Sequence, residues 1–302
     1  MCRWTAKNKE RDDVIDFEKV SRVHFNSGKA WIQPQFIIPG VRRGELAVLA
    51  AAGATGKSYL GQMMGMSVAT GVSVFPFLPV VRPYRVLSLQ FEDLPEDVEN
   101  RGNAILRAYP ALDVGSLENF FCSACPGESL DLVNAESVNS DVVASFISYA
   151  RDYDLIILDP LTNLWNECDE NDAQAAMRLM KVLRRVAVEC SAAVLICHHV
   201  NKNSLWNKRS DEQSAVRGSG AFVNAPRCVM TMAAVPKDEA PNSGGDSSAV
   251  ALAWPKLNNH PLIGPVNLYR GWRGVLFMTP WEAEQSVQHW RDNPRPMDAI
   301  AY

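Results

Sequence analysis

Residues Gly44–Leu60 read GELAVLAAAGATGKSYL and carry the most informative pattern of the chain. A short apolar run, Leu46–Ala50, is followed by small residues, then by Gly-Lys-Ser, and then by a segment with helical apolar spacing. This order predicts a buried strand, a tight loop and a helix. The amides of such a loop can surround an anion, and the helix that starts there directs the positive end of its dipole at that anion. The stretch therefore predicts a phosphate-binding loop.

The pattern is that of a P-loop NTPase, and it assigns roles to the residues of the loop. Lys57 is expected to reach the β- and γ-phosphates, and the Ser58 hydroxyl is expected to bind Mg²⁺. The usual pattern opens with Gly where this chain has Ala51, which is small enough to end the strand. A chance Gly-Lys-Ser in a turn is the alternative, and the strand and helix predicted on either side disfavour it. The residues expected to contact the nucleotide are Ala52, Gly53, Ala54, Thr55, Gly56, Lys57, Ser58 and Tyr59.

A carboxylate follows the next predicted strand, Arg85–Phe91 (RVLSLQF). Residues just past the carboxyl ends of the strands lie where open α/β sheets bind ligands. Glu92 is therefore expected to be the base that polarises the water attacking the γ-phosphate. The alternative is an ordinary acid that caps the following helix, a role that fits Asp93 better.

Two further strand ends complete the expected site. Tyr153–Asp159 reads YDLIILD, and it resembles a Walker B strand whose final Asp159 holds Mg²⁺ directly or through water. The run Ala192–Cys197 predicts a fully buried strand that closes with two histidines. Of these, His199 rather than His198 is expected to sense the nucleotide near the γ-phosphate. A capping or core histidine is the alternative.

The composition is that of an ordinary globular protein, with 302 residues of which 47% are hydrophobic and 21% charged. The net charge of −4 gives no global sign of nucleic-acid binding, so any such contact must come from local loops. No apolar run reaches the roughly 18 residues that a membrane helix needs. The start, MCRWTAKNKERDD, lacks the apolar core of a signal peptide. These features predict a cytoplasmic protein without membrane contacts.

Three parts are expected along the chain: a flexible N-terminal arm at 1–30, an ATPase domain at 31–280 and a C-terminal tail at 281–302. Residues 31–43 carry two prolines and an apolar cluster, which predict a short edge strand that leads into the core. Late in the domain, apolar segments separated by polar residues up to 278 predict antiparallel hairpins.

The stretch 201–216 is polar, partly basic and poor in apolar periodicity, so we expect it to be mobile. Lys202, Lys208 and Arg209 can contact a phosphate backbone there, and Trp206 can stack on a base of single-stranded DNA. The alternative is an ordinary solvated loop.

The strand order and the signatures together match the RecA-like ATPase core. That core is an α/β fold with a central, mostly parallel twisted sheet flanked by helices, followed here by C-terminal antiparallel hairpins. A GTPase would need an Asn-Lys-x-Asp motif, and Asn201-Lys202-Asn203 lacks the Asp. Within the RecA-like class, the chain resembles the RepA family of hexameric replicative helicases of plasmids and mobile elements over roughly residues 35–278. The segments that carry this resemblance are AAGATGKS, the strand ending FED, LIILDPL with ENDA and AMRLMKVLRRVA, VLICHHVNK, and RGSGAFVNAPRCV.

The resemblance implies a homohexameric ring with ATP and Mg²⁺ at each subunit interface and single-stranded DNA in the central channel. It also implies an arginine that is presented to the γ-phosphate of the neighbouring subunit. Arg227 is expected to be this residue, with Arg217 as the runner-up and Lys256 as a companion cation. An arginine in trans stabilises transition-state charge and makes hydrolysis depend on assembly.

The function predicted from the sequence is therefore a Mg²⁺-dependent ATPase in a ring, coupling hydrolysis to movement along single-stranded DNA. Two alternatives stay open. One is a RecA-fold ATPase that serves as a regulatory, assembly or recombination factor without unwinding. The other is a non-enzymatic interaction module with a degenerate phosphate loop. The 201–216 stretch is only mildly basic, and the net charge is acidic. Both features favour the first alternative more strongly than the sequence of a typical helicase would favour it.

Overall fold

The unbroken apolar runs of the sequence become the inner strands of a nine-stranded sheet. The computed structural model describes residues 35–112, 114–165, 168, 171–199, 219–236 and 248–292, which belong to one compact unit. The strands are β1 (Phe36–Ile38), β2 (Val41–Arg42), β3 (Leu46–Ala51), β4 (Val86–Gln90), β5 (Phe120–Ala124), β6 (Leu155–Asp159), β7 (Ala193–His199), β8 (Cys228–Ala234), β9 (Ala249–Leu257), β10 (Val266–Arg270) and β11 (Leu276–Phe277). The helices are α1 (Lys57–Thr70), α2 (Pro95–Ala108), α3 (Ser140–Ala150), α4 (Ala173–Glu189), α6 (Ala221–Asn224) and α7 (Pro280–Asp292), with short 3₁₀ turns η2 (Val114–Asn119), η3 (Leu161–Leu164) and η5 (Trp272–Gly274).

The large sheet has the strand order β11-β10-β9-β8-β3-β7-β6-β4-β5. All neighbours from β8 through β3 to β5 run parallel. Strands β9, β10 and β11 extend the sheet beyond β8 as antiparallel hairpins. The predicted α/β class, with a mostly parallel sheet and C-terminal antiparallel hairpins, is confirmed.

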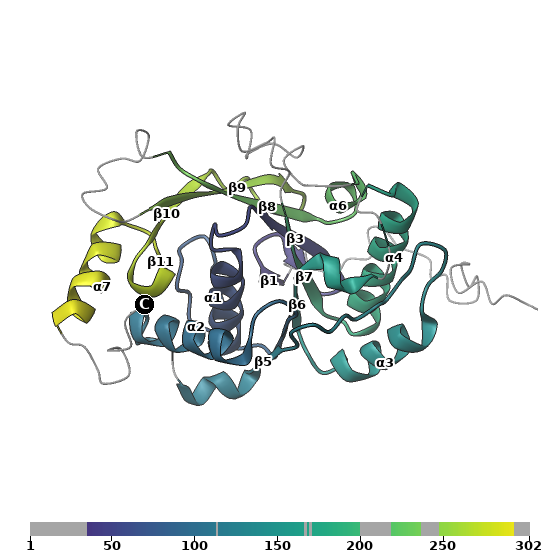
Figure 1. The fold of residues 1–302 in the computed structure, drawn as a ribbon, viewed down its shortest axis with the longest axis horizontal. Coiled ribbons are helices and arrows are strands. Elements are labelled where there is room, and N and C mark those ends of the chain that lie inside the picture. Colours follow the sequence, from purple (N-terminus) through teal and green to yellow (C-terminus); the bar gives the residue numbers. More distant parts are fainter. Residues whose placement is uncertain are drawn as a thin grey trace, which may run out of the picture. The chain divides into compact units, whose positions relative to one another are not determined.

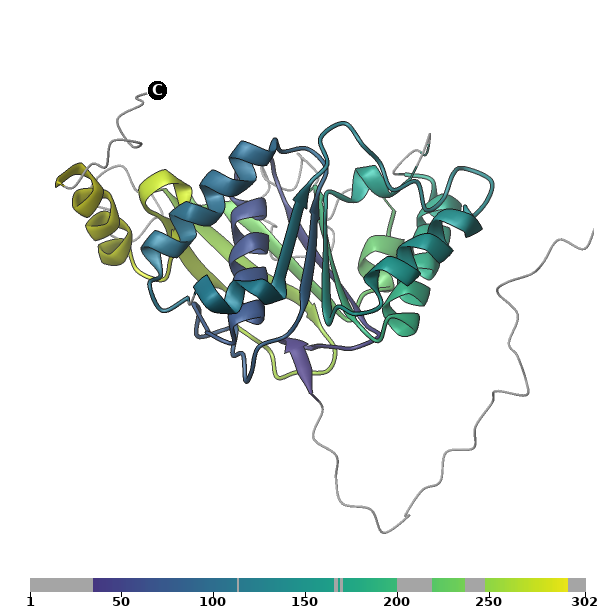
Figure 2. The same cartoon turned by 90° about the horizontal axis from the view of Figure 1, so that it is seen from below.

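Helices cover both faces of this sheet, and Figure 2 shows the two layers edge-on (Figure 1, Figure 2). Helices α1 and α2 pack on one face, and α3, α4 and α6 pack on the other. Alternate residues of β3 enter the two cores, so Leu49 belongs to the α1 side and Val48 to the α4 side. A parallel strand that is buried on both faces needs an apolar residue at every position, which explains the continuous apolar runs of β3 and β6.

The parallel register brings the carboxyl ends of four strands to one rim of the sheet. Ala51, the last residue of β3, pairs with His199 on β7. Gln90, the last residue of β4, pairs with Asp159, the last residue of β6. The phosphate loop after β3 and Glu92 after β4 therefore emerge at the same rim as Asp159 and His199.

Two strands differ from their predicted form. The expected lead-in strand is β1, which pairs antiparallel with β2 in a separate two-stranded sheet instead of joining the large one. The strand predicted at Ala192–Cys197 continues through both histidines as β7, because β3 offers a parallel partner as far as His199.

The predicted C-terminal tail at 281–302 begins with a helix, α7, which packs against β10, β11 and η5. A capping box starts it: Thr279 Oγ1 accepts from Glu282 N at 3.2 Å, and Glu282 Oε2 accepts from Thr279 N at 3.0 Å. Pro280 at the first helical position suits this start. The spacing Thr-x-x-Glu is typical of a helix start, and it marks the beginning of α7 in the sequence.

Several predictions fall outside the described residues: the N-terminal arm at 1–30, the loop 201–216 and Arg217. They stay predictions. Within the part of the chain that the structure describes, no helix has both the length and the apolar character needed to cross a membrane.

Candidate active site

The loop between β3 and α1 is shaped by its own hydrogen bond and by two left-handed residues. The Thr55 hydroxyl donates to the Ala52 carbonyl at 2.7 Å. Ala54 has φ 59°, and Gly56, the N-cap of α1, has φ 95°. Glycine adopts this region without steric penalty, and a Cβ at Gly56 would also lie 3.7 Å from Leu276 Cδ2. The turn leads directly into α1, whose first N–H groups have no intrahelical acceptor and can bind an anion.

Lys57 and Asp159 form a buried ion pair that joins the start of α1 to the end of β6. Lys57 Nζ lies 2.5 Å from Asp159 Oδ1, and the two residues are 7% and 4% exposed. Burial by itself lowers the pKa of the Lys57 ammonium, but the carboxylate of Asp159, with a smaller contribution from Glu92, raises that pKa above its ordinary value. The other carboxylate oxygen, Asp159 Oδ2, is buried without a hydrogen-bond partner. One strong acceptor is therefore left open beside the loop.

A pocket of about 300 Å³ lies over this loop. Its lining residues are Ala52, Gly53, Ala54, Gly56, Lys57, Ser58, Tyr59, Glu92, Arg101, His199, Arg270 and Gly274. Glu92 and His199 thus share one cavity with the phosphate loop, although they are distant in sequence. Thr55 was expected to contact the nucleotide but is not in the pocket wall, because it is buried and its hydroxyl is used by Ala52.

The two histidines of β7 face different surroundings. His198 is fully buried, and its ring lies 5.0 Å from the ring of Phe222. His199 lines the phosphate-loop pocket. Successive side chains of a strand point to opposite faces, so only one of two adjacent histidines can face the pocket. The geometry favours His199 as the sensor, and that role stays a prediction.

Asp93 does not cap α2, so the role suggested for it from the sequence is wrong. The N-cap is Leu94, which has no side-chain cap, and Pro95 begins the helix. Asp93 Oδ2 instead accepts a hydrogen bond from Arg101 Nη2 at 2.5 Å. Arg101 is 9% exposed, and its guanidinium carbon lies 5.3 Å from the centre of the Tyr59 ring. The acid is drawn to this buried cation rather than to the helix end.

Three residues of the pocket wall were not predicted: Arg101, Arg270 and Gly274. Arg270 ends β10, and Gly274 lies in the turn that follows, so both reach the loop only through the order of strands in the sheet. No local motif marks either position. A readable signal existed at Arg101, a cation on the helix that directly follows the strand-end acids.

Arg227 lies at the opposite end of the sheet from the phosphate loop. Its backbone N–H donates to the Leu46 carbonyl, and the next residue, Cys228, pairs with Ala47 near the start of β3. The phosphate loop begins after Ala51, at the other end of that strand. At about 3.3 Å per residue, the four steps from Ala47 to Ala51 separate the two places by roughly 13 Å. Arg227 therefore lies far along the sheet from Lys57 of the same chain.

Lys256 lies beside Arg227 and is also remote from the loop. Its Nζ donates to the Val223 and Asn224 carbonyls at 2.9 and 2.8 Å, which binds β9 to the end of α6. Burial, and then the charge of Arg227, lower the pKa of Lys256. The two cations predicted to act together are thus neighbours in the structure.

An open groove of about 690 Å³ runs between α4 and α6 and includes Arg227 in its wall. Lys181 and Arg184, both on α4, line the same groove. These three side chains give it a positive charge, which suits an anionic occupant.

A family model described as an AAA domain matches residues 17–204. The chain belongs to the AAA domain family. Its phosphate loop, strand-end acids and mostly parallel sheet make this AAA domain a RecA-like P-loop ATPase, as the sequence predicted. Among solved structures, the chain is similar to the RadB recombinase, with 13% sequence identity and a TM-score of 0.49 over 79% of this chain and 92% of that one. No curated protein sequence matches it.

The rim residues of this AAA domain fit a bound Mg²⁺. Asp159 Oδ2 is an unpartnered, buried carboxylate oxygen, and Ser58 lines the pocket next to Lys57. Mg²⁺ prefers such oxygen ligands, and it usually keeps several waters while it shares one or two protein groups with substrate phosphates. Among the described residues, no group of three or more His, Cys, Asp or Glu could hold a metal. The oxygens of Asp159 and Ser58 suit an ion that shares its other ligands with nucleotide phosphates and water.

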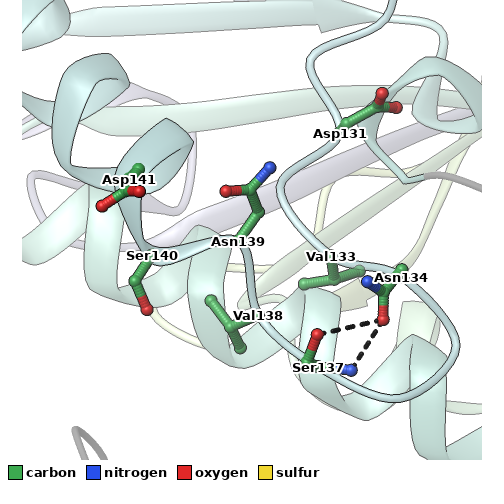
Figure 3. A pocket seen from close by; sticks show the side chains of 8 residues that line it. All are labelled: Asp131, Val133, Asn134, Ser137, Val138, Asn139, Ser140 and Asp141. Carbon is green, nitrogen blue, oxygen red and sulfur yellow. Dashed lines mark hydrogen bonds between the residues drawn. The ribbon is translucent and has the colours of Figure 1, made fainter.

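A separate cavity of about 440 Å³ lies at the turn before α3 of the AAA domain (Figure 3). Asn134 Oδ1 accepts from the Ser137 N–H and hydroxyl at 2.8 and 3.2 Å, and Asn139 caps α3. Asn134 and Ser137 are thus used by the turn, and Asn139 by the helix cap. The lining residues are Asp131, Val133, Asn134, Ser137, Val138, Asn139, Ser140 and Asp141, and none of them lines the phosphate-loop pocket.

Proposed function

We propose that this chain is a Mg²⁺-dependent ATPase that forms a ring and acts on single-stranded DNA as a helicase or translocase. The observation that carries the ATPase assignment is the 2.5 Å contact of Lys57 Nζ with Asp159 Oδ1, with Asp159 Oδ2 left open. It joins a phosphate-binding lysine to a metal-binding acid in one site. The resemblance to the RepA family supports the hexameric ring and a role in plasmid or mobile-element replication.

Hydrolysis requires a held triphosphate, an activated water and neutralised charge. Lys57 and the first amides of α1 bind the phosphates. Ser58 and Asp159 would hold Mg²⁺, which would supply neutralisation of the phosphate charge. Glu92 accepts a proton from water while the water oxygen bonds to the γ-phosphorus and the bond from that phosphorus to the ADP oxygen breaks. The products are ADP and phosphate.

Glu92→Gln is expected to stop turnover while leaving nucleotide binding intact. The amide keeps the size of the side chain but cannot take the proton, so kcat should fall about 10²–10⁴-fold with a nearly unchanged Kd. Steady-state phosphate release and titration with a fluorescent ATP analogue measure the two quantities. Glu96→Gln, an exposed acid in the first turn of α2, is the matched control and should behave as wild type. A Glu92→Gln protein with normal kcat would remove Glu92 from the mechanism.

Assembly into a ring is supported by the position of Arg227. Because it lies roughly 13 Å along the sheet from its own phosphate loop, it can complete a site only on another copy. Lys256 beside it and the positive groove with Lys181 and Arg184 suit the anionic face of a neighbour's nucleotide. A head-to-tail contact of this kind closes into a ring when the rotation between neighbouring subunits is a whole-number fraction of a full turn.

DNA coupling is assigned to the segment 201–216, which begins two residues after His199, the last residue of β7. His199 lines the pocket where a γ-phosphate is expected, so a change there can be passed to the residues that follow it. The basic and aromatic residues of that segment suit a DNA backbone and its bases.

ATP hydrolysis is expected to rise several-fold with oligo-dT and to fall as salt increases, because phosphate contacts release counterions. Phosphate release with and without oligo-dT over a salt series measures this. Light scattering with a non-hydrolysable ATP analogue should show a ring-sized oligomer. Hydrolysis that ignores DNA, in a protein that stays monomeric, would favour a regulatory, assembly or recombination factor without unwinding activity instead.

A further inference from the structure

Arg270 reaches the phosphate loop from a strand that is not adjacent to it. β10 is separated from β3 by β9 and β8 in the sheet, yet Arg270 Nη2 donates to the Ala54 carbonyl at 2.5 Å. The guanidinium also lies 3.9 Å from the position that a Cβ on Gly56 would take. It is therefore part of the wall of the same 300 Å³ pocket that holds Lys57 and Glu92.

The charge of Arg270 is poorly compensated by the described residues around it. Its Nε is buried without a hydrogen-bond partner, and its guanidinium donates to a neutral carbonyl, Ala54 O. Burial lowers the pKa of the Arg270 guanidinium, and no nearby carboxylate among the described residues opposes that effect. A half-buried cation with an unused donor is unfavourable unless an anion joins it.

Lys57 differs from Arg270 in this respect, because it already has the Asp159 carboxylate as a partner at 2.5 Å. Arg270 is thus a cation of the loop pocket without a carboxylate partner among the described residues. The guanidinium fork matches phosphate oxygens, which are charged acceptors and stronger than a carbonyl.

We propose that Arg270 binds the phosphates of a nucleotide held in the same subunit, exchanging the Ala54 carbonyl for a phosphate oxygen. The proposal rests on the proposed nucleotide binding and adds a phosphate ligand in cis, distinct from the trans cation assigned to Arg227. The exchange frees the Ala54 carbonyl and loosens one of the contacts that tie the end of β10 to the loop. The neighbouring hydrogen bond from the Tyr59 hydroxyl to the Arg273 backbone carbonyl does not involve the Arg270 side chain, so the exchange leaves it in place.

The test compares the full-length protein with three variants by titration with a fluorescent, non-hydrolysable ATP analogue and Mg²⁺. Arg270→Gln keeps a donor for the Ala54 carbonyl but has no charge, and its Kd should rise about 10–100-fold. Arg270→Lys keeps the charge and should recover part of that loss. Arg107→Ala removes a cation on α2 whose guanidinium carbon lies 5.8 Å from the centre of the Trp272 ring and which does not line the pocket. It should bind as wild type.

Thermal unfolding without nucleotide distinguishes a role of Arg270 in binding phosphate from a role in stabilising the fold. For a phosphate ligand, Arg270→Gln unfolds at the wild-type temperature and loses affinity. An Arg270→Gln protein with wild-type affinity overturns the proposal, whatever its unfolding temperature. Failure of the wild type itself to bind the analogue would instead overturn the nucleotide-binding function on which the proposal rests.

Discussion

Lys57→Ala is expected to remove detectable ATP binding and, with it, hydrolysis. Lys57 is the cation expected at the β- and γ-phosphates, and it lines the loop pocket. Loss of a charged phosphate contact in a water-excluded site typically lowers turnover about 10²–10³-fold or more. Titration with a fluorescent ATP analogue and phosphate release measure both effects.

A structural consequence has to be separated from this loss. In Lys57→Ala the Asp159 carboxylate stays buried with neither oxygen paired, and removing one partner of a buried pair costs about 3–5 kcal/mol. The double variant Lys57→Met with Asp159→Asn removes both charges and should recover much of the unfolding free energy, as measured by urea denaturation. It should still fail to bind the analogue. A folded double variant with wild-type affinity would contradict the assigned role of Lys57.

Much of the sheet and three of its strand ends could be read from the sequence for one physical reason. A parallel strand buried on both faces must be largely apolar, so β3 and β6 are visible as apolar runs. β4 and β7 are visible as mostly apolar runs that also hold buried polar residues, Ser88 and Gln90 in β4 and His198 in β7. Charged or titratable residues mark the rim, because Asp159 and His199 are the last residues of β6 and β7 and Glu92 follows β4. Their convergence on Lys57 follows from the parallel register.

The features that the sequence could not predict depend on strand order and on which nearby group pairs with a charged side chain. Arg270 meets the phosphate loop because β9 and β10 fold back beside β8, and no spacing along the chain encodes that. In the sequence Asp93 has the position of a helix cap, but in the structure its carboxylate accepts a hydrogen bond from Arg101. Tertiary packing determines which charged side chains pair, and the patterns of a single sequence do not show that packing.

Arg227→Ala is expected to lower kcat about 10³-fold or more while leaving the Kd for the ATP analogue nearly unchanged, as for an arginine supplied in trans. In its own subunit Arg227 lies near the Ala47 end of β3, so its loss does not touch the phosphate loop. Arg185→Ala is the matched control, an arginine on α4 that pairs with Glu189 at 2.7 Å and does not line the groove. It should hydrolyse ATP as wild type.

Mixing two inactive proteins tests the trans geometry itself. An Arg227→Ala subunit keeps Glu92, and a Glu92→Gln subunit keeps Arg227, so an interface between them in one orientation regains both groups. With random assembly of equal amounts, one interface in four has this arrangement, and hydrolysis should return to about a quarter of the wild-type rate per site if the sites act independently. A mixture that stays inactive, although light scattering shows that the two proteins co-assemble, would mean that Arg227 does not complete a neighbour's site. The ring mechanism would then have no arginine at the nucleotide, because roughly 13 Å of strand separates Arg227 from the phosphate loop of its own chain.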